Sequence, residues 1–407
     1  MPQKNTLDDS HLASQNIDDN GPGSILMDFE VLLGFVDDGV RSTGKHHLLP
    51  MAQLFELDKL MTKPLRPRLK RPQQKSFPHL NGLYLLLRAT QLGVVEGLGK
   101  ANGRLMLDAA MHKMWLQLNP TERYFNLLEA WLRWGSWEAV GLRGGGRMSH
   151  IALDARELWM SIPKAGRSFS TKERAGGEFL YSVERSCTLA LLELFGLMTV
   201  ERGEPGEGQS WCVTKVRRTP FGDELLQIVF NEIERALFAR AKRAVKFGVW
   251  QPVLRSYFPQ WVNNLKIADL EFRDGAYFFK VSLGKPWRRI AIPAKSDLDD
   301  LAECIIRAFD FDGDHLYGFS LVARDGHQIR VGHPEIDDAE AHTDELAIGE
   351  LPLNERQSMQ FQYDFGADWR FDVQLEKIET ETTKISKPTI VESRGEAPAE
   401  YEFDDEW

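Results

Sequence analysis

Cysteine is scarce in this sequence, which contains Cys187, Cys212 and Cys304 among its 407 residues. Three widely spaced cysteines argue against a disulfide-stapled fold and exclude a zinc site built from four cysteines. No apolar run approaches the roughly 20 residues that a membrane-spanning helix needs. The first 20 residues are polar and acidic, so we expect no secretory signal there. We therefore expect a cytoplasmic protein that has no membrane partner.

Charge is unevenly distributed along the chain, whose net charge is −10. Residues 63–250 carry 29 lysines and arginines against 18 aspartates and glutamates. Residues 1–62 carry 4 against 10, and residues 251–407 carry 17 against 32. Such a change of sign indicates separate domains with different partners, and the length suits two or three domains. A basic middle region is what a polyanion-binding surface needs.

Two segments near the N-terminus lack a regular hydrophobic pattern. Apart from the apolar piece Ile25–Phe35, residues 1–45 show no periodicity, and we expect them to form a mobile acidic tail. The segment Lys63–Lys75 has prolines at positions 64, 67 and 72, which keep it extended. It is either a solvated linker or a basic arm that contacts DNA phosphates. The candidate DNA contacts are Lys63, Arg66, Arg68, Lys70, Arg71 and Lys75.

A weak internal repeat divides the mostly helical, net basic block at residues 46–250. Residues 86–96 and 191–201 each begin as an apolar helix, break near a glycine and continue into a short strand. A glycine-rich turn, a second strand and a further helix follow in both copies. This order of elements resembles a winged helix, so the block is predicted to hold two winged-helix-like units. Winged helices bind DNA or other proteins, and the fold alone does not decide between these functions.

The pattern changes to strands after an aromatic connector predicted at residues 251–271. Residues 359–363 and 369–378 alternate apolar and polar side chains, as half-buried strands do. Apolar residues at helical spacing between Leu298 and Phe309 predict a helix that packs on the sheet. We therefore expect a multidomain protein in which residues 272–407 form a net acidic α+β domain with a mostly antiparallel sheet.

Four separated motifs in this domain occur in a recognisable order. They are Trp287–Pro293, the helix from Leu298, Asp314–Phe319, and Tyr363–Gly366 with Trp369. On these motifs the last third of the chain resembles the plasmid pRi ORF-3-like family, whose function is largely unknown. Members are often described as insertion-element passenger or resolvase-like ("TnpR") proteins, which implies a bacterial mobile-element context. The chain departs from the family pattern at Ala367, Asp368 and Phe371, where the family usually has Asp, Gly and His.

No combination of residues indicates a particular reaction, so we expect no catalytic residues, no metal and no cofactor. Asp310–Asp314 resembles the opening of a calcium-binding loop. That pattern fails because its sixth position is His315 rather than glycine and its twelfth is Leu321 rather than glutamate. An ordinary acidic turn is the simpler interpretation. A metal held by Asp312, Asp314 and His315 is the alternative.

The C-terminal domain offers one candidate binding cluster. Arg288 or Arg289 is predicted to form a bidentate pair with Asp364 from an adjacent strand, shielded by Trp369. Such a pair either fixes the register of the strands or binds a ligand or partner peptide. The candidate binding residues are Arg288, Arg289, Asp364, Trp369 and His315.

Three classes of function remain open from the sequence. The first is a non-enzymatic accessory or regulatory protein of plasmid or mobile-element DNA, which binds DNA through the basic helical block. The second is a protein–protein adaptor without nucleic-acid contact. The third is an enzyme of unrecognised type in the C-terminal domain, which would need convergent polar groups in a deep pocket.

Overall fold

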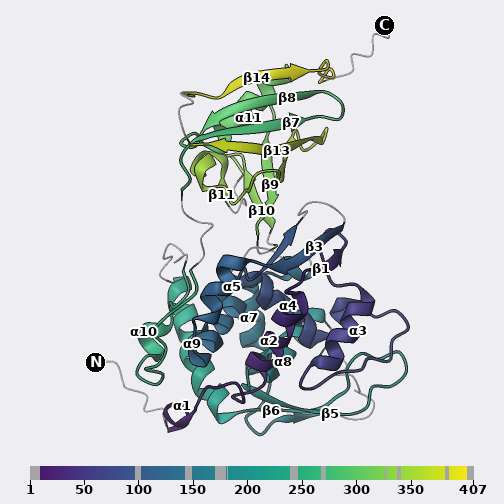
Figure 1. Cartoon of the computed structure of the whole chain (residues 1–407), viewed down its shortest axis with the longest axis vertical. Helices are drawn as coiled ribbons and strands as arrows, with labels where there is room; N and C mark the ends of the chain where they lie inside the picture. The colour runs from purple at the N-terminus through teal and green to yellow at the C-terminus, as the bar shows by residue number, and fades with distance from the viewer. Residues whose placement is uncertain are drawn as a thin grey trace. The chain divides into compact units, whose positions relative to one another are not determined.

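The chain divides into two compact units, residues 1–267 and residues 268–407 (Figure 1). Each unit has a hydrophobic core of its own, as separate domains do. None of the described helices is long and apolar enough to cross a membrane. The structure, a computed structural model, describes residues 10–96, 102–142, 149–169, 180, 182–238, 246–266, 272–324, 326, 328–336, 341–380 and 385–400.

Helices make up most of the first unit, together with two small antiparallel sheets of order β1-β3-β2 and β4-β6-β5. The α-helices are α1 (Ser10–Ser14), α2 (Ile25–Val36), α3 (Met51–Leu60), α4 (Pro78–Ala89), α5 (Ala109–Leu116), α6 (Pro120–Glu129), α7 (Ser149–Met160), α8 (Val183–Leu194), α9 (Pro220–Phe238) and α10 (Gln251–Leu254). The shorter helical turns are η1 (Gln74–Ser76), η2 (Ala130–Trp134) and η3 (Trp137–Val140). The strands are β1 (Val40–Thr43), β2 (Gly93–Glu96), β3 (Asn102–Leu107), β4 (Arg167–Ser168), β5 (Met198–Arg202) and β6 (Val213–Arg218).

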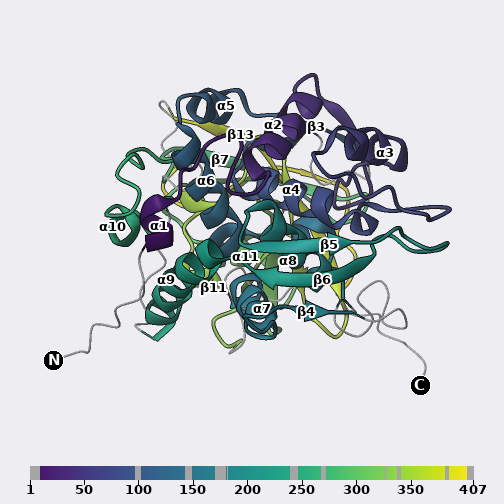
Figure 2. The ribbon, with the colours of Figure 1, turned by 90° about the horizontal axis from the view of Figure 1, so that it is seen from below.

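The repeat in the sequence corresponds to a repeated arrangement of elements. In the first copy α4 leads into the β2–β3 hairpin, and in the second copy α8 leads into the β5–β6 hairpin. In each copy an earlier strand pairs antiparallel with the second strand of the hairpin, β1 with β3 and β4 with β6. Figure 2 shows β4, β6 and β5 side by side. Both copies therefore share one order of helix, hairpin and added strand.

The two repeat helices pack against each other inside the first unit. All twelve residues of α4 are buried, and so is the part of α8 from Cys187 to Leu194. Gly82 of α4 permits the close approach, because a Cβ there would lie 2.8 Å from Cγ of Leu191 in α8. Most of both helices is therefore withdrawn from solvent.

The prediction of a mobile tail at residues 1–45 is wrong for the described residues 10–45. Leu12 is buried in the core, and α2 buries seven of its residues. The backbone N–H of Ser24 donates a hydrogen bond to the carbonyl of Leu194 over 2.9 Å. The apolar piece Ile25–Phe35, which the prediction excepted, forms α2. The polar residues on both sides of it are held by partners far along the chain, such as Glu224 for Leu12 and β3 for β1, and no local pattern reveals these partners.

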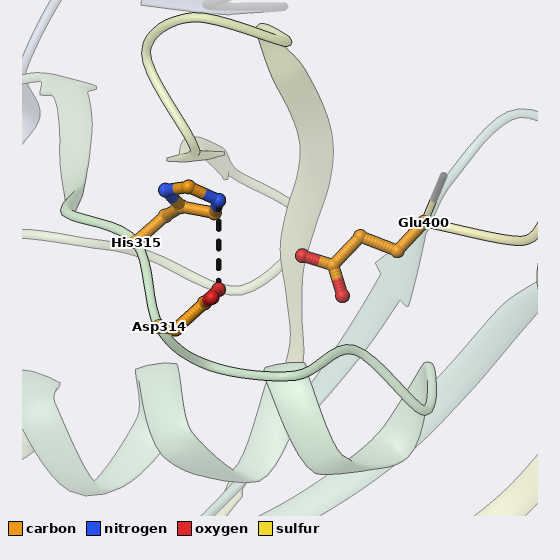
Figure 3. Close-up of side chains that lie close together, drawn as sticks. All are labelled: Asp314, His315 and Glu400. Carbon is orange, nitrogen blue, oxygen red and sulfur yellow. Dashed lines mark ion pairs between the residues drawn. The ribbon is translucent and has the colours of Figure 1, made fainter. Parts of the chain in front are cut away.

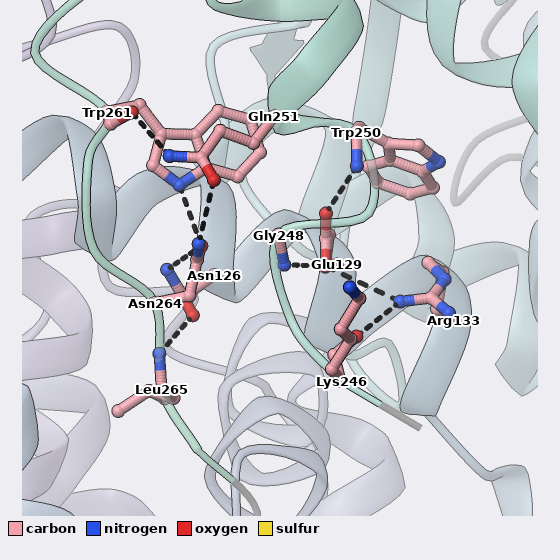
Figure 4. A network of polar contacts seen from close by, with 10 residues as sticks. All are labelled: Asn126, Glu129, Arg133, Lys246, Gly248, Trp250, Gln251, Trp261, Asn264 and Leu265. Carbon is pink, nitrogen blue, oxygen red and sulfur yellow. Dashed lines mark hydrogen bonds and ion pairs between the residues drawn. The ribbon is translucent and has the colours of Figure 1, made fainter. Parts of the chain in front are cut away.

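The predicted aromatic connector also belongs to the core of the first unit over its described residues 251–266. Trp261 stacks on Phe125 of α6, with ring centroids 4.3 Å apart. The side-chain oxygen of Asn126, also in α6, accepts a hydrogen bond of 2.9 Å from the backbone N–H of Leu265 (Figure 4). These contacts hold the segment on α6 as part of the first unit.

A buried carboxylate on α6 fixes the start of the same segment (Figure 4). Glu129 is fully buried and accepts backbone hydrogen bonds from Gly248 (2.7 Å) and Trp250 (3.0 Å). Arg133 lies 3.5 Å from the same carboxylate. Burial raises the pKa of Glu129 to about 7, although Arg133 and the backbone donors act in the opposite direction.

The second unit is an eight-stranded sheet of order β11-β10-β9-β12-β13-β7-β8-β14, and α11 (Leu298–Ala308) shares its core. The strands are β7 (Ala276–Ser282), β8 (Trp287–Pro293), β9 (Tyr317–Val322), β10 (Gln328–Gly332), β11 (Ala341–His342), β12 (Ser358–Tyr363), β13 (Trp369–Glu379) and β14 (Thr389–Arg394). Two short turns, η5 (Thr343–Glu345) and η6 (Ile348–Glu350), follow β11. The pairing of β10 with β11 is parallel, and the other pairings in this sheet are antiparallel. The α+β class is therefore confirmed, with a mixed sheet.

Candidate functional site

The basic segment 63–75, here called the basic strap, crosses the surface of the first unit between α3 and α4. Four of its residues are buried, namely Leu65, Pro67, Pro72 and Gln74. The basic side chains are all exposed, namely Lys63, Arg66, Arg68, Lys70, Arg71 and Lys75. The basic strap is thus attached to the unit by its apolar residues and turns its positive charge to solvent.

Asp58 in α3 fixes the start of the basic strap. Its carboxylate accepts backbone hydrogen bonds from Leu65 (2.9 Å) and Arg66 (3.0 Å), and it lies 3.0 Å from Nε2 of His79. Burial acts to raise the pKa of Asp58, but His79 and the two backbone donors outweigh it and lower that pKa. The carboxylate is therefore held ionised as a fixed acceptor under the strap.

The middle of the basic strap is joined to the β5–β6 hairpin. The backbone N–H of Arg68 donates to the carbonyl of Gln209, and the N–H of Gly208 donates to the carbonyl of Arg68, both over 2.9 Å. Closer to the strap's start, the guanidinium of Arg202 donates to the carbonyl of Lys63 over 2.9 Å. Strap and hairpin therefore form one continuous edge of the first unit.

Acidic partners reach only part of the basic strap. Lys63 pairs with Glu193 at 3.0 Å, and Arg68 lies 3.9 Å from Glu204 in the hairpin. Within the described part of the chain, the ion pairs do not include Arg66, Lys70, Arg71 or Lys75. The second half of the strap therefore keeps its positive charge uncompensated by neighbouring carboxylates.

The tip of the β5–β6 hairpin has the opposite charge. Glu204 and Glu207 are both exposed there, whereas β6 exposes Arg217 further from the tip. Carboxylates at the tip would repel phosphates. The surface suited to a polyanion is therefore the basic strap with the adjoining body of the hairpin.

The structure separates the arginines that the sequence grouped with Asp364. Arg288 is buried and donates hydrogen bonds to the carbonyls of Ala308 (2.7 Å), Arg394 (3.1 Å) and Gly395 (3.1 Å). Its guanidinium also lies 4.7 Å from the centroid of the Phe309 ring. Arg288 therefore ties β8 to the end of α11 and to β14, which is a structural role.

Arg289 likewise has partners other than Asp364. Its guanidinium forms an ion pair with Glu376 of β13 at 2.6 Å and a second ion pair with Glu392 of β14. The predicted pairing of Asp364 with Arg288 or Arg289 is therefore wrong. The sheet order explains the error, because β13 and β7 lie between β12, which precedes Asp364, and β8.

Asp364 and Trp369 flank the turn between β12 and β13. Oδ1 of Asp364 accepts a hydrogen bond of 2.8 Å from the backbone N–H of Gly366, and backbone donors in this turn lower the pKa of Asp364. Its Oδ2 lies 3.7 Å from Nε2 of His315. Trp369 packs edge-on against Phe311, with centroids 5.1 Å apart. Asp364 therefore lies near His315 and Trp369 in the described structure, and its partner is His315 rather than an arginine.

A group that the sequence did not reveal surrounds His315 instead. Asp314 and His315 lie on the loop between α11 and β9, and Glu400 lies on the segment after β14 (Figure 3). One donor atom from each of these three side chains lies within 4.8 Å of the other two. The Tyr363 hydroxyl is 3.5 Å from Oδ1 of Asp314. Oxygen and imidazole donors of this kind are those that hold metal ions in proteins.

The loop with Asp314 and His315 also borders a cavity of about 540 Å³ in the second unit. Carboxylates line much of it, among them Asp299, Glu303 and Glu335. The hydroxyl of Tyr317 donates to Asp299 over 2.6 Å, and burial followed by this contact raises the pKa of Tyr317. The cavity is therefore acidic, in agreement with the acidic charge of the whole unit.

Comparison with known proteins identifies the second unit. Residues 277–404 match the family described as plasmid pRiA4b ORF-3-like protein, which confirms the resemblance found in the sequence. Among solved structures, the chain is similar to a protein of unknown function from Methanosarcina mazei Go1, with 25% identity and a TM-score of 0.28. That similarity covers 31% of this chain and 73% of the other. No curated protein matches the chain.

Proposed function

We propose that this protein, whose second unit is a plasmid pRi ORF-3-like domain, is a non-enzymatic accessory or regulatory protein that binds DNA through the basic strap of its first unit. The exposed face of the strap carries the argument, because its six basic side chains are exposed while Leu65, Pro67 and Pro72 are buried. Lys and Arg side chains on such an edge neutralise phosphates and release condensed counterions.

The burial of α4 and α8 favours contacts with the DNA backbone rather than with bases. A helix that reads bases must enter the major groove with its side chains free. Every residue of α4 is buried, and α8 is buried from Cys187 onward. Phosphate contacts alone carry no sequence information. The protein is therefore proposed to bind DNA with little preference for sequence.

We further infer that each repeat of the first unit is a winged-helix unit. The element order α2-β1-α3-α4-β2-β3 supports this for the first repeat, and α7-β4-α8-β5-β6 supports it for the second. In this interpretation the β5–β6 hairpin is a wing, and the basic strap runs along its edge. The two units then form a tandem held together by the contact between α4 and α8.

The test is DNA binding by the whole chain, measured by fluorescence anisotropy with short labelled duplexes of two unrelated sequences. The double variant Lys70→Glu/Arg71→Glu should lose about 10-fold or more in affinity at ~50 mM salt, about equally on both sequences. The slope of log K against log salt should fall by about 2, because two phosphate contacts are lost.

A matched control carries the same change of charge elsewhere on the first unit. Lys113 on α5 and Arg255 just after α10 are both exposed, and Figure 1 places these helices away from the β5–β6 hairpin. Lys113→Glu/Arg255→Glu should change affinity much less than the strap variant does. Equal losses in both variants would mean that the strap is not the binding surface.

The adaptor function is the second candidate, and the buried repeat helices are the observation that favours it. Winged-helix units whose helices are covered have lost the usual means of reading DNA. The adaptor proposal expects no affinity for either duplex even at ~50 mM salt, where non-specific contacts are strong. The same anisotropy experiment therefore separates the two proposals.

A further inference from the structure

The loop that carries Asp314 and His315 is fixed at several points in the second unit. The backbone N–H of Gly313 donates to the hydroxyl of Tyr363 over 3.0 Å. The backbone N–H of Asp312 donates to Oε2 of Glu400 over 2.6 Å. Strand β12 and the C-terminal segment therefore hold the loop, and the same hydrogen bonds bring Glu400 to Asp314 and His315.

The distances within this group fit side chains that converge on one point. Nε2 of His315 is 3.5 Å from Oδ1 of Asp314. Nitrogen and oxygen donors bound to one metal at about 2.0–2.2 Å lie roughly 3–4 Å from each other. Because the donors of Asp314, His315 and Glu400 all lie within 4.8 Å, small side-chain rotations bring them onto a common ion. Figure 3 shows the Glu400 carboxylate extended toward the other two side chains.

One carboxylate oxygen in this group is left incomplete. Oε1 of Glu400 is screened from solvent and makes no hydrogen bond of ordinary geometry within the described part of the chain, although the Tyr363 hydroxyl lies close to this carboxylate, which adds to burial in raising the pKa of Tyr363. A buried, unpaired polar atom costs free energy, and in folded proteins it is nearly always satisfied by a partner. The carboxylates of Asp314 and Asp364 lie near the same imidazole, and this concentration of negative charge beside Glu400 favours a cation.

We propose that Asp314, His315 and Glu400 bind a divalent transition-metal ion in the second unit. The imidazole favours zinc over magnesium or calcium, which prefer oxygen ligands, and the two carboxylates also suit manganese. Three protein donors leave coordination positions open for water, as in sites that bind or activate a further ligand. Asp314 and His315 also line the cavity of about 540 Å³, which gives such a ligand room beside the ion.

The test is calorimetric titration of the chelator-treated full chain with Zn²⁺, with Mn²⁺ and Mg²⁺ in parallel. The wild type should bind Zn²⁺ or Mn²⁺ at least 10-fold more tightly than Mg²⁺. Each of Asp314→Asn, His315→Gln and Glu400→Gln should weaken the tight site by at least 10-fold. Binding should also weaken as the pH falls, because only the neutral imidazole is a ligand.

The matched controls change the same residue types nearby. Glu396→Gln removes an exposed carboxylate from the same C-terminal segment, and His333→Gln removes another imidazole at the cavity. Both controls should retain wild-type affinity. Circular dichroism checks that each variant is folded.

A measurement on the wild type keeps the proposal testable if a variant fails to fold. Bound Mn²⁺ should broaden the ring signals of His315 more than those of His333 in the NMR spectrum of histidine-labelled protein. Wild-type affinity in all three ligand variants would overturn the proposal, as would broadening that spares His315. DNA binding by the first unit does not depend on either result.

Discussion

The carboxylates of Glu129 in the first unit and Glu400 in the second differ in how their hydrogen bonds are completed. In the first unit Glu129 receives backbone donors from Gly248 and Trp250 on separate oxygens and lies beside Arg133. In the second unit Glu400 uses Oε2 to hold the backbone of Asp312, whereas its Oε1, with the Tyr363 hydroxyl nearby, makes no hydrogen bond of ordinary geometry among the described residues. A completed carboxylate of this kind serves the fold. The incomplete one is where we propose the metal ion.

The two units also differ in the sign of their net charge. Residues 1–267 carry 35 lysines and arginines against 28 acids, whereas residues 268–407 carry 15 against 32. The basic strap concentrates the surplus of the first unit at one edge, and the cavity of the second unit is lined by carboxylates. The comparison suggests a polyanion partner for one unit and a cationic ligand for the other.

The largest expected effect is that of Glu129→Ala. This variant leaves Arg133 without its carboxylate and the N–H groups of Gly248 and Trp250 without acceptors. We expect a loss of about 3–5 kcal/mol in the free energy of unfolding of the first unit, as for a broken buried ion pair. Denaturant unfolding followed by tryptophan fluorescence measures it. Glu400→Gln should lower the free energy of unfolding of the second unit by less than about 1 kcal/mol. Equal losses in the two variants would contradict the contrast between the two carboxylates.

Within the second unit, Arg288→Ala should destabilise far more than Asp364→Ala does. Removing the buried guanidinium of Arg288 takes away the donor shared by three carbonyls at the junction of β8, α11 and β14, at a cost of about 2–3 kcal/mol. Asp364 lies in a turn and has no arginine partner in the described structure, so its loss should cost less than about 1 kcal/mol. Thermal unfolding of both variants measures the difference. A larger loss of stability in Asp364→Ala would mean that Asp364 pairs with an arginine after all.

The stability of the first unit should depend on pH through Glu129. Burial raises the pKa of Glu129 from 4.5 to about 7 in the folded protein, so the folded state keeps this proton after the unfolded state has lost it. Stability should therefore fall as the pH rises from about 4.5 to about 7 and level off above that range. Unfolding free energies of wild type and Glu129→Gln across this range give the contribution of Glu129 as their difference. A pH-independent difference would contradict the assignment.

The smallest expected effect concerns the tip of the β5–β6 hairpin. Glu204→Gln/Glu207→Gln removes two exposed carboxylates beside the basic strap, so DNA affinity should rise a few-fold at low salt and converge with the wild type at high salt. Anisotropy titrations at two salt concentrations measure it. Unchanged affinity at low salt would mean that DNA does not approach this edge.

Patterns local in sequence predicted the fold well, and contacts distant in sequence did not follow from them. The alternating residues 359–363 and 369–378 became β12 and β13 because each strand needs only one buried face. The repeat was visible because helix and hairpin follow each other directly. By contrast, the residues on both sides of α2 are held by partners far along the chain, such as Glu224 for Leu12 and β3 for β1, so their polar sequence suggested a tail.

The candidate site of the second unit shows the same limit. The pairing of Asp364 with an arginine could be judged only from the strand order. Two strands lie between β12 and β8, so three spacings of about 4.8 Å place these groups roughly 14 Å apart. Glu400 gave no signal, because it lies 85 residues after His315 and no spacing rule joins them. The Asp-His pair of residues 314 and 315 was the only part of this group visible in the sequence.

The most direct test of DNA binding compares the whole chain with residues 1–267 at ~50 mM salt. That boundary keeps the segment held by α6, which a fragment ending at residue 250 would lose. Both proteins should bind a short duplex, with affinity falling steeply as salt rises. The fragment should bind more tightly, because the acidic second unit no longer repels the phosphates. No measurable binding by the fragment at ~50 mM salt would contradict the account and leave the adaptor function in its place.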